Sequence, residues 1–310
     1  MARQSQVVNG KAFEYCVAIE LSNRLDIQIR KGPELETCHL AYQSISPELA
    51  TQMVSGAAIA VDHVIDLEKK KLDDAKLNEI WIAADARGQK GDVRDVVVET
   101  SQGQMGISCK NNHEAFKHSR LSGTINFVKK WGLDPAGCSE EYWARIRLIF
   151  NELKVIRRES NGEALFRDLD DVPGRFYQPV LSAFSDELKR VSTSGPSPSG
   201  SVPLNLVTYV VGRQDFYKVI RESASVVVQG FNFNGSLSTS RTRGPSHLIG
   251  IDRLDGSDDS ITVRLNRGFT FNFRIHSAKS SVEPSLKFDI TAVSLPPAEI
   301  YINHLRVASV

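Results

Sequence analysis

The stretch GDVRDVVVETSQGQMGISCKNNHEAFKHSR, residues 91–120, decides how the rest of the chain is interpreted. Its alternating residues predict two short strands joined by a tight turn. Because side chains alternate faces along a strand, Asp95 and Glu99 share one face of the first strand, and Ser108 and Lys110 share one face of the second. Pairing of the strands would bring an acid, a hydroxyl and a lysine together at one end of a hairpin. A carboxylate holds a hard cation and a lysine stabilises phosphate charge, so the hairpin has the minimal set for metal-assisted phosphodiester hydrolysis.

Two plainer interpretations of this hairpin stay open. An aspartate and a lysine at such a distance are common, so a structural hairpin with exposed polar residues explains them equally well. Cys109 could act as a nucleophile with His113 or His118 as its base. It alternates onto the apolar face with Ile107, however, and this favours a buried structural cysteine.

Composition limits the function classes. The chain has 310 residues, 41% of them hydrophobic, which is enough for one large domain or two modest ones. Its net charge is only +1, so a nucleic-acid-binding surface must be local. There is no apolar run that could span a bilayer, no leader pattern, and no pair among the four cysteines at zinc spacing. We therefore expect a cytoplasmic protein without disulfides and without a membrane partner.

Other motifs exclude further classes of enzyme. The sequence has no phosphate-binding loop of the Walker type, no dinucleotide-binding glycine motif and no His-Glu-x-x-His motif. These absences argue against a nucleotide-driven motor, a dinucleotide oxidoreductase and a zinc protease.

The order of predicted elements changes along the chain. Residues 1–191 are mainly helical around the hairpin, residues 192–203 form a linker or loop rich in Ser, Pro and Gly, and residues 204–310 are rich in β pattern. The predicted helices are 10–25 with Asn9 as its N-cap, one from Pro47 to Leu72, and others near 125–131, 139–156 and 178–191. The predicted strands are 79–84, 204–211, 225–231, 261–265, 269–275 and 286–293.

Two polar runs could contact nucleic acid. The first run is dense in donors for phosphates and base edges, although a polar loop leading into a helix explains it equally well. It consists of Asn111, Asn112, His113, Lys117, His118 and Arg120. In the second, Arg274 and His276 share a strand face opposite Phe271, Phe273 and Ile275. This cationic face suits a phosphate or base contact, and a surface salt-bridge face is the alternative.

Several blocks, in this order along the chain, resemble the HaeIII-type family of type II restriction endonucleases. The likeness runs from Gly10 to about Asp289, and the order and number of the blocks make it specific. The blocks are Gly10–Glu14, Gly91–Asp95, Gly106–His113, Lys117–Ser122, Cys138–Trp143, Phe273–Ala278 and Val282–Asp289.

The resemblance implies an α/β fold with a PD-(D/E)xK nuclease core, a mixed sheet flanked by helices that carries Mg²⁺ at its strand ends. Residues 1–191 would then hold the nuclease core. Residues 204–310 would form a β-rich C-terminal part that recognises DNA and completes the core.

The resemblance also assigns roles to residues. Asp95 becomes the principal metal ligand and Lys110 the catalytic lysine. Glu14, which by itself suggests a solvated helix carboxylate, becomes a metal ligand from the first helix. Ser108 departs from the acid of the general PD-(D/E)xK pattern, so Glu14 or Glu99 would supply the remaining carboxylate, beside the Cys109 carbonyl and water.

The implied activity is Mg²⁺-dependent, site-specific cleavage of both strands of DNA at a short GC-rich palindrome such as GGCC, leaving 5′-phosphates. A companion DNA methyltransferase would act on the same site, and a palindromic target favours a two-fold dimer over a monomer that cuts each strand in turn. The alternatives are a repair or structure-selective nuclease on the same core, and a catalytically silent DNA-binding protein. Further candidates for DNA contact are Arg241, Arg243, Ser285 and Lys287.

Overall fold

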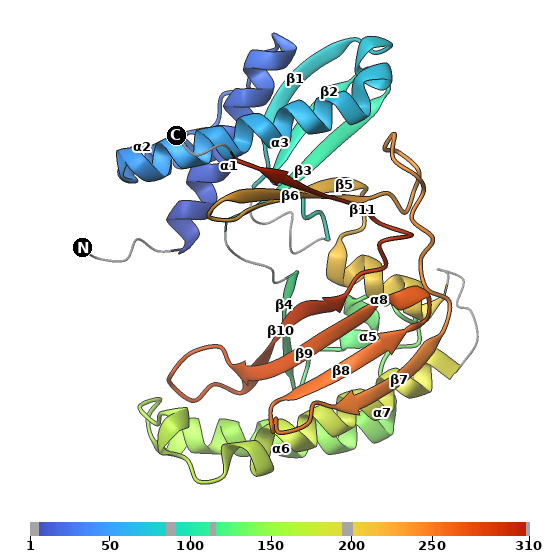
Figure 1. Ribbon diagram of the computed structural model, residues 1–310. Coiled ribbons are helices and arrows are strands. Elements are labelled where there is room, and N and C mark those ends of the chain that lie inside the picture. The colour runs from blue at the N-terminus through green and yellow to red at the C-terminus, as the bar shows by residue number, and fades with distance from the viewer. Residues whose placement is uncertain (1–5, 85–90, 112–115, 194–200, 308–310) are drawn as a thin grey trace. The chain divides into compact units, whose positions relative to one another are not determined.

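The structure, a computed structural model, describes residues 6–84, 91–111, 116–193 and 201–307 (Figure 1). The chain forms two compact units, each assembled from separate segments. Unit 1 comprises residues 1–114, 212–243 and 297–310, and unit 2 comprises residues 115–211 and 244–296. The division is therefore not a single cut at residues 192–203, because a strand from beyond residue 212 pairs with the strand of residues 103–111.

Unit 1 is built on a six-stranded mixed sheet with the order β1-β2-β3-β5-β6-β11. β3 and β5 are parallel, and every other neighbouring pair is antiparallel. The predicted hairpin is present as β2 and β3. The strands are β1 (Leu77–Ile82), β2 (Val96–Thr100), β3 (Gly103–Asn111), β5 (Phe216–Arg221), β6 (Ser225–Phe231) and β11 (Tyr301–Arg306).

Three helices pack against this sheet: α1 (Gln6–Leu25), α2 (Pro33–Ser44) and α3 (Pro47–Asp73) (Figure 1). Phe13, Val17 and Leu21 of α1 are fully buried, and the sheet contributes Val96, Ile107 and Cys109 to the same core. Ser46 caps α3 by accepting a hydrogen bond from the Leu49 backbone N–H.

Two details of the helices differ from the prediction. Asn9 lies inside α1 and is not its N-cap, because the helix already includes Gln6. α2 was missed because its sequence has little apolar periodicity, and Cys38 is its one buried residue.

Unit 2 contains a five-stranded antiparallel sheet with the order β4-β10-β9-β8-β7. Its inner face packs on aromatic side chains from the helices; Phe184 of α7 lies 5.0 Å from Phe288 and 5.6 Å from Phe273, measured between ring centroids. The strands are β4 (Lys117–Ser122), β7 (Leu248–Arg253), β8 (Ser260–Leu265), β9 (Thr270–Ser277) and β10 (Ser285–Ser294). The helices are α5 (Phe127–Lys130), α6 (Glu140–Glu159), α7 (Gln178–Thr193) and α8 (Val202–Val211).

One predicted element in unit 2 is wrong. The apolar run 204–211 forms helix α8, not a strand, because a short run that is buried on most sides has no period that separates the two. The polar run 117–122, for which a loop leading into a helix was one of two open interpretations, forms strand β4, which pairs with β10 and is followed by α5. Residues 194–200 of the predicted linker lie outside the described residues, and Val202 and Pro203 belong to α8.

None of the described helices combines the length and the apolar composition that a membrane span requires. All four cysteines are free, and Cys16, Cys38 and Cys109 are buried.

Candidate active site

The carboxylate of Asp95 is fixed by the hairpin. Asp95 directly precedes β2, and its backbone N–H donates to the carbonyl of Ile107 at 2.8 Å. One carboxylate oxygen, Oδ2, accepts hydrogen bonds from the Cys109 backbone N–H at 2.7 Å and from the Ser108 hydroxyl at 3.1 Å. The chain thus holds this acid against β3 at the end where Lys110 lies.

Lys110 lies on the same face as Ser108 and Asp95. Its Nζ is 3.8 Å from Oδ2 of Asp95, and its side chain remains 31% exposed. The lysine is therefore close to the carboxylate and can still reach a substrate. The structure brings together the acid, hydroxyl and lysine that the hairpin pattern predicted.

Glu14 adds a second carboxylate from α1. It is 7% exposed, pairs with Lys11 at 3.0 Å, and accepts from the Cys38 thiol at 3.6 Å. Burial, followed by the nearby negative charge of Asp95, raises the pKa of Glu14 to about 7, against the lowering effect of Lys11 and Lys110. Glu14 is therefore near enough to Asp95 for the two charges to act on each other.

Cys109 belongs to this cluster through its backbone. Burial, together with the charges of Asp95 and Glu14, keeps the pKa of its thiol well above the usual range, so the sulfur remains protonated. The side chain packs in the apolar core, which rules out the nucleophile and agrees with the structural interpretation.

The residues present fit a divalent cation. Asp95 and Glu14 offer hard oxygen ligands, and their mutual repulsion is what a cation between them would relieve. Within the described ranges, no cluster of three or more His, Cys, Asp or Glu side chains is placed to hold a metal alone. Mg²⁺ commonly takes one or two carboxylates and completes its shell with water and phosphate oxygens, so the set suits Mg²⁺.

Glu99 does not join the cluster. It lies at the other end of β2, about 13 Å along the strand from Asp95. There it accepts a hydrogen bond from the Trp81 indole at 3.3 Å and lies 3.9 Å from the Arg30 guanidinium. The face expected for Glu99 is correct, but shared face does not imply proximity, and the expectation that it could replace the missing acid is corrected.

Asn111 also lies elsewhere than expected. It alternates onto the helix-covered face with Cys109, is 7% exposed, and accepts a hydrogen bond from Nε of Arg221 at 2.7 Å. It is an internal residue of unit 1 and not a surface contact for DNA. Asn112 and His113 lie outside the described residues.

Two residues that contact Glu14 were not identified from the sequence. Lys11 precedes Glu14 by one helical turn, and that spacing could have indicated the ion pair. Cys38 comes from α2, a helix with no clear sequence signal, so its contact with Glu14 could not be predicted.

Glu14→Gln is expected to raise the free energy of unfolding of the metal-free protein at pH 8 by about 1–3 kcal/mol. Because the folded pKa of about 7 exceeds the ordinary 4.5, the stability that protonated Glu14 provides is present below pH 4.5 and lost as pH rises through 7. Urea denaturation at pH 5 and pH 8, in chelator, measures the difference. Exposed Glu36→Gln is the control, and a gain at pH 8 no larger than at pH 5 would contradict the assignment.

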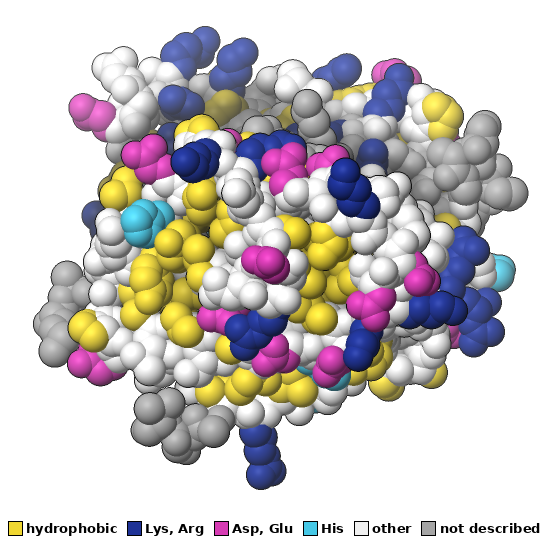
Figure 2. All heavy atoms as spheres, turned by 90° about the horizontal axis from the view of Figure 1, so that it is seen from above, with side chains coloured by type: hydrophobic (Ala, Val, Ile, Leu, Met, Phe, Trp, Pro, Cys, Tyr) yellow, Lys and Arg dark blue, Asp and Glu magenta, His cyan; other side chains and the backbone are white. Residues whose placement is uncertain are grey.

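A cationic surface is found on unit 2. Figure 2 shows Lys and Arg interspersed with Asp, Glu and apolar side chains on the face it draws, in keeping with the small net charge. On the outer face of the unit 2 sheet, by contrast, several predicted DNA-contact residues lie side by side on neighbouring strands. In the strand register, Lys287 lies opposite Arg120 and His276. Asp289 lies opposite His118 and Arg274. We call this the basic sheet face: His118 and Arg120 of β4, Arg274 and His276 of β9, and Ser285 and Lys287 of β10.

Asp289 lies in the middle of the basic sheet face. It is 2.9 Å from Nε2 of His276 and 3.6 Å from Nζ of Lys287, and it also pairs with His118. Partial burial opposes ionisation, but the hydrogen bond from His276 and the two histidine charges lower the pKa of Asp289. The carboxylate therefore ties three basic side chains from adjacent strands together.

The remaining cations of the basic sheet face are held at its borders. Arg120 donates to the Ser285 hydroxyl at 3.1 Å and to Glu283 at 3.3 Å, and Arg274 pairs with Asp259 at 3.0 Å. Lys117 alternates away from this face and lies 4.8 Å from the Tyr209 ring centroid.

Arg241 and Arg243 lie on a loop of unit 1 that follows β6. Arg241 donates to the Phe233 carbonyl at 3.1 Å, and Arg243 pairs with Glu299 at 3.0 Å. The loop begins beyond Phe231, at one end of the sheet, whereas Lys110 lies towards the other end. Both arginines are thus held by partners within unit 1.

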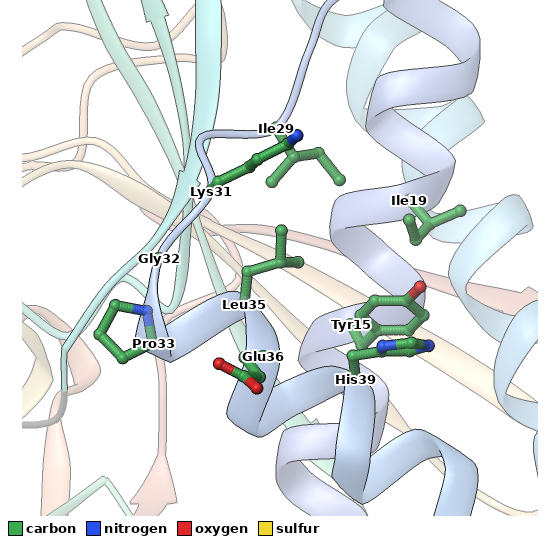
Figure 3. A pocket seen from close by; sticks show the side chains of 9 residues that line it. All are labelled: Tyr15, Ile19, Ile29, Lys31, Gly32, Pro33, Leu35, Glu36 and His39. Carbon is green, nitrogen blue, oxygen red and sulfur yellow. The ribbon is translucent and has the colours of Figure 1, made fainter.

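An apolar pocket of about 560 Å³ lies beside α1 and α2 but is distinct from the Asp95 cluster. Figure 3 shows Tyr15 and His39 side by side, with ring centroids 5.0 Å apart, near Leu35. The candidate catalytic side chains do not line it. Tyr15 directly follows Glu14, but successive side chains on a helix point about 100° apart, so the two residues face different sides of α1.

Comparison with known proteins decides the family. A family model described as HaeIII restriction endonuclease matches residues 10–296. This chain belongs to the HaeIII restriction endonuclease family. A relative, "Type II restriction enzyme HaeIII" from Haemophilus aegyptius, is 31% identical over 314 aligned positions, covering 95% of this chain and 96% of that protein. The comparison with solved structures found no match.

Membership of the HaeIII family confirms the resemblance carried by the sequence blocks, and with it the enzyme class, a restriction endonuclease. The mixed sheet flanked by helices in unit 1, with β-rich segments in the second half of the chain, agrees with the expected α/β fold.

Proposed function

We propose that the protein cuts both strands of DNA at a short palindrome in a Mg²⁺-dependent reaction that leaves 5′-phosphates. The observation that carries the proposal is the cluster of Asp95, Lys110 and Glu14, placed together in a chain of the HaeIII family. A GC-rich site such as GGCC, which the resemblance to the HaeIII-type family implies, is the proposed target.

Each residue of the cluster has a role in the proposed reaction. Asp95 and Glu14 would hold the cation, together with the Cys109 carbonyl. Bound Mg²⁺ would supply a polarised phosphate and a water of lowered pKa. Lys110 would orient that water and help to remove its proton, and in-line displacement of the 3′-oxygen would leave a 5′-phosphate and a 3′-hydroxyl.

DNA binding is proposed for the basic sheet face. Arginine and lysine donate to guanine O6 and N7 in the major groove, and both also bind phosphates. Arg120 and Arg274 are 47% and 58% exposed and could exchange their carboxylate partners for DNA. Lys117, Arg241 and Arg243 are proposed as phosphate contacts outside this face.

Three further proposals follow from restriction activity. A companion methyltransferase would protect the same sequence in the host DNA. A two-fold dimer would match a palindromic target. The host DNA that such a pair protects implies that both act in the cytoplasm.

Digestion of plasmid DNA of known sequence in Mg²⁺, with mapping of the cut ends, tests the proposed function. Discrete fragments with 5′-phosphates at one repeated palindrome are expected. A smear or cutting only at branches would favour a repair or structure-selective nuclease. Gel shift in Ca²⁺ without any cleavage in Mg²⁺ would indicate a silent DNA-binding protein.

Arg120→Ala is expected to weaken DNA binding about tenfold and to reduce the slope of log K against log salt by about one. The reason is the loss of one exposed guanidinium from the basic sheet face. Fluorescence anisotropy across a salt series in Ca²⁺ measures both quantities. Arg157→Ala, an exposed arginine on α6, is the matched control, and an unchanged slope would remove Arg120 from the interface.

A further inference from the structure

Ser108 occupies the position at which the general PD-(D/E)xK pattern has an acid, and it is not a passive substitute. It is 2% exposed, and its hydroxyl donates to Oδ2 of Asp95 at 3.1 Å. A buried hydroxyl aimed at the principal carboxylate of the candidate site contributes to the geometry of that carboxylate.

The two oxygens of Asp95 have different surroundings. Oδ2 accepts from both Ser108 and the Cys109 backbone N–H, with Nζ of Lys110 at 3.8 Å. Within the part of the chain that the structure describes, Oδ1 accepts no hydrogen bond. Donors thus engage one oxygen and leave the other for a ligand.

The serine and the backbone N–H act together on the carboxylate. A single hydrogen bond from the Cys109 N–H would anchor Oδ2 but leave rotation about it, whereas a second donor from Ser108 fixes the carboxylate plane. Partners of this kind orient metal ligands, and their loss commonly costs 10- to 100-fold in metal affinity or activity.

We infer that Ser108 is a positioning residue that turns Oδ1 of Asp95 towards the cation. The inference rests on the proposed metal-dependent cleavage. Residue 108 would then have a different role from the acid of the general pattern: it orients the metal ligand Asp95 and is not a metal ligand itself. An acid at position 108 would set a carboxylate against Oδ2, where the hydroxyl now donates.

Three variants test the inference: Ser108→Ala, Ser108→Thr and Ser108→Asp. Two readouts are used, the Mg²⁺ concentration for half-maximal cleavage and Mg²⁺ binding by calorimetry on the full chain. Ser108→Ala is expected to raise the required Mg²⁺ by about 10- to 100-fold. Ser108→Thr, which keeps the hydroxyl, is expected to restore most of the affinity, and Ser108→Asp is expected to bind Mg²⁺ more weakly than the wild type.

The inference is overturned if Ser108→Ala keeps the wild-type Mg²⁺ requirement. It is equally overturned if Ser108→Asp binds Mg²⁺ more tightly than the wild type, since the position would then be a vacant ligand position. A Ser108→Thr variant that melts like the wild type but fails to recover Mg²⁺ binding also contradicts it.

Ser185→Ala is the matched control. Ser185 is also buried, and its hydroxyl donates to the Leu181 carbonyl at 2.7 Å within α7, so the control loses a buried serine hydrogen bond in unit 2. Cleavage by the wild type separates failure of the proposed function from failure of the inference. If the wild type shows no Mg²⁺-dependent cutting, the proposed function is rejected. If the wild type cuts and Ser108→Ala has the same Mg²⁺ requirement, only the inference is rejected.

Discussion

Asp95→Asn is expected to lower the rate of DNA cleavage about a thousandfold or more, with little change in DNA binding. The amide keeps an oxygen that can accept from the Cys109 N–H and the Ser108 hydroxyl, so the hairpin retains its hydrogen bonds. What it loses is the negative charge that would hold the cation. Single-turnover cleavage in Mg²⁺ and anisotropy in Ca²⁺-free buffer measure the two properties separately.

The asparagine is more informative than alanine at this position. Alanine would leave the Cys109 N–H without its side-chain acceptor, and a lost structure could then be mistaken for lost chemistry. Asp62→Asn is the control, since Asp62 is an exposed residue of α3 that pairs with Arg24 on the surface. Cleavage by Asp95→Asn at a rate near that of the wild type would show that the cation is held elsewhere.

Lys110→Met is expected to reduce kcat about 100- to 1000-fold and to leave KM nearly unchanged. Methionine keeps an unbranched apolar stem, so packing along β3 is preserved while the charge 3.8 Å from Asp95 is removed. The effect falls on kcat because Lys110 is assigned to the attacking water and not to DNA binding. Steady-state kinetics on a short duplex separate the two constants.

Lys110→Arg tests whether the positive charge of residue 110 is enough for cleavage. Arginine restores the positive charge but stays protonated and cannot accept the proton of the water, so unchanged DNA binding without recovery of kcat is expected. Lys70→Met, at an exposed position near the end of α3, is the control for general loss of charge. A Lys110→Met enzyme that cuts as fast as the wild type would place the proton transfer on another group.

The sequence predicted the centre of the site because its pattern is local. Strand alternation placed Asp95, Ser108 and Lys110 on one face, and the structure confirms that arrangement. The same reasoning failed for Glu99, because alternation identifies a face and carries no information on position along the strand. Proximity of Glu14 depends on how α1 packs on the sheet, which only the family resemblance indicated.

Most errors in the fold arose where distant parts of the chain decide the outcome. The pairing of β3 with β5 joins residues more than a hundred positions apart, and no short-range pattern predicts it. Val202–Val211 lacks a clear period because most of its residues are buried, so helix α8 was predicted as a strand. Lys117–Ser122 becomes a strand through its pairing with β10, despite its polar composition.

The position of β5, more than a hundred residues after β3 in the sequence, has a consequence for folding during synthesis. When β3 emerges from the ribosome, the strand that will flank it is separated from it by residues 115–211 of unit 2. Until then, β3 is an open edge, and such long-range parallel pairing is slow to form. Nascent chains are therefore expected to lack a finished unit 1 sheet until the strands beyond residue 212 have been translated.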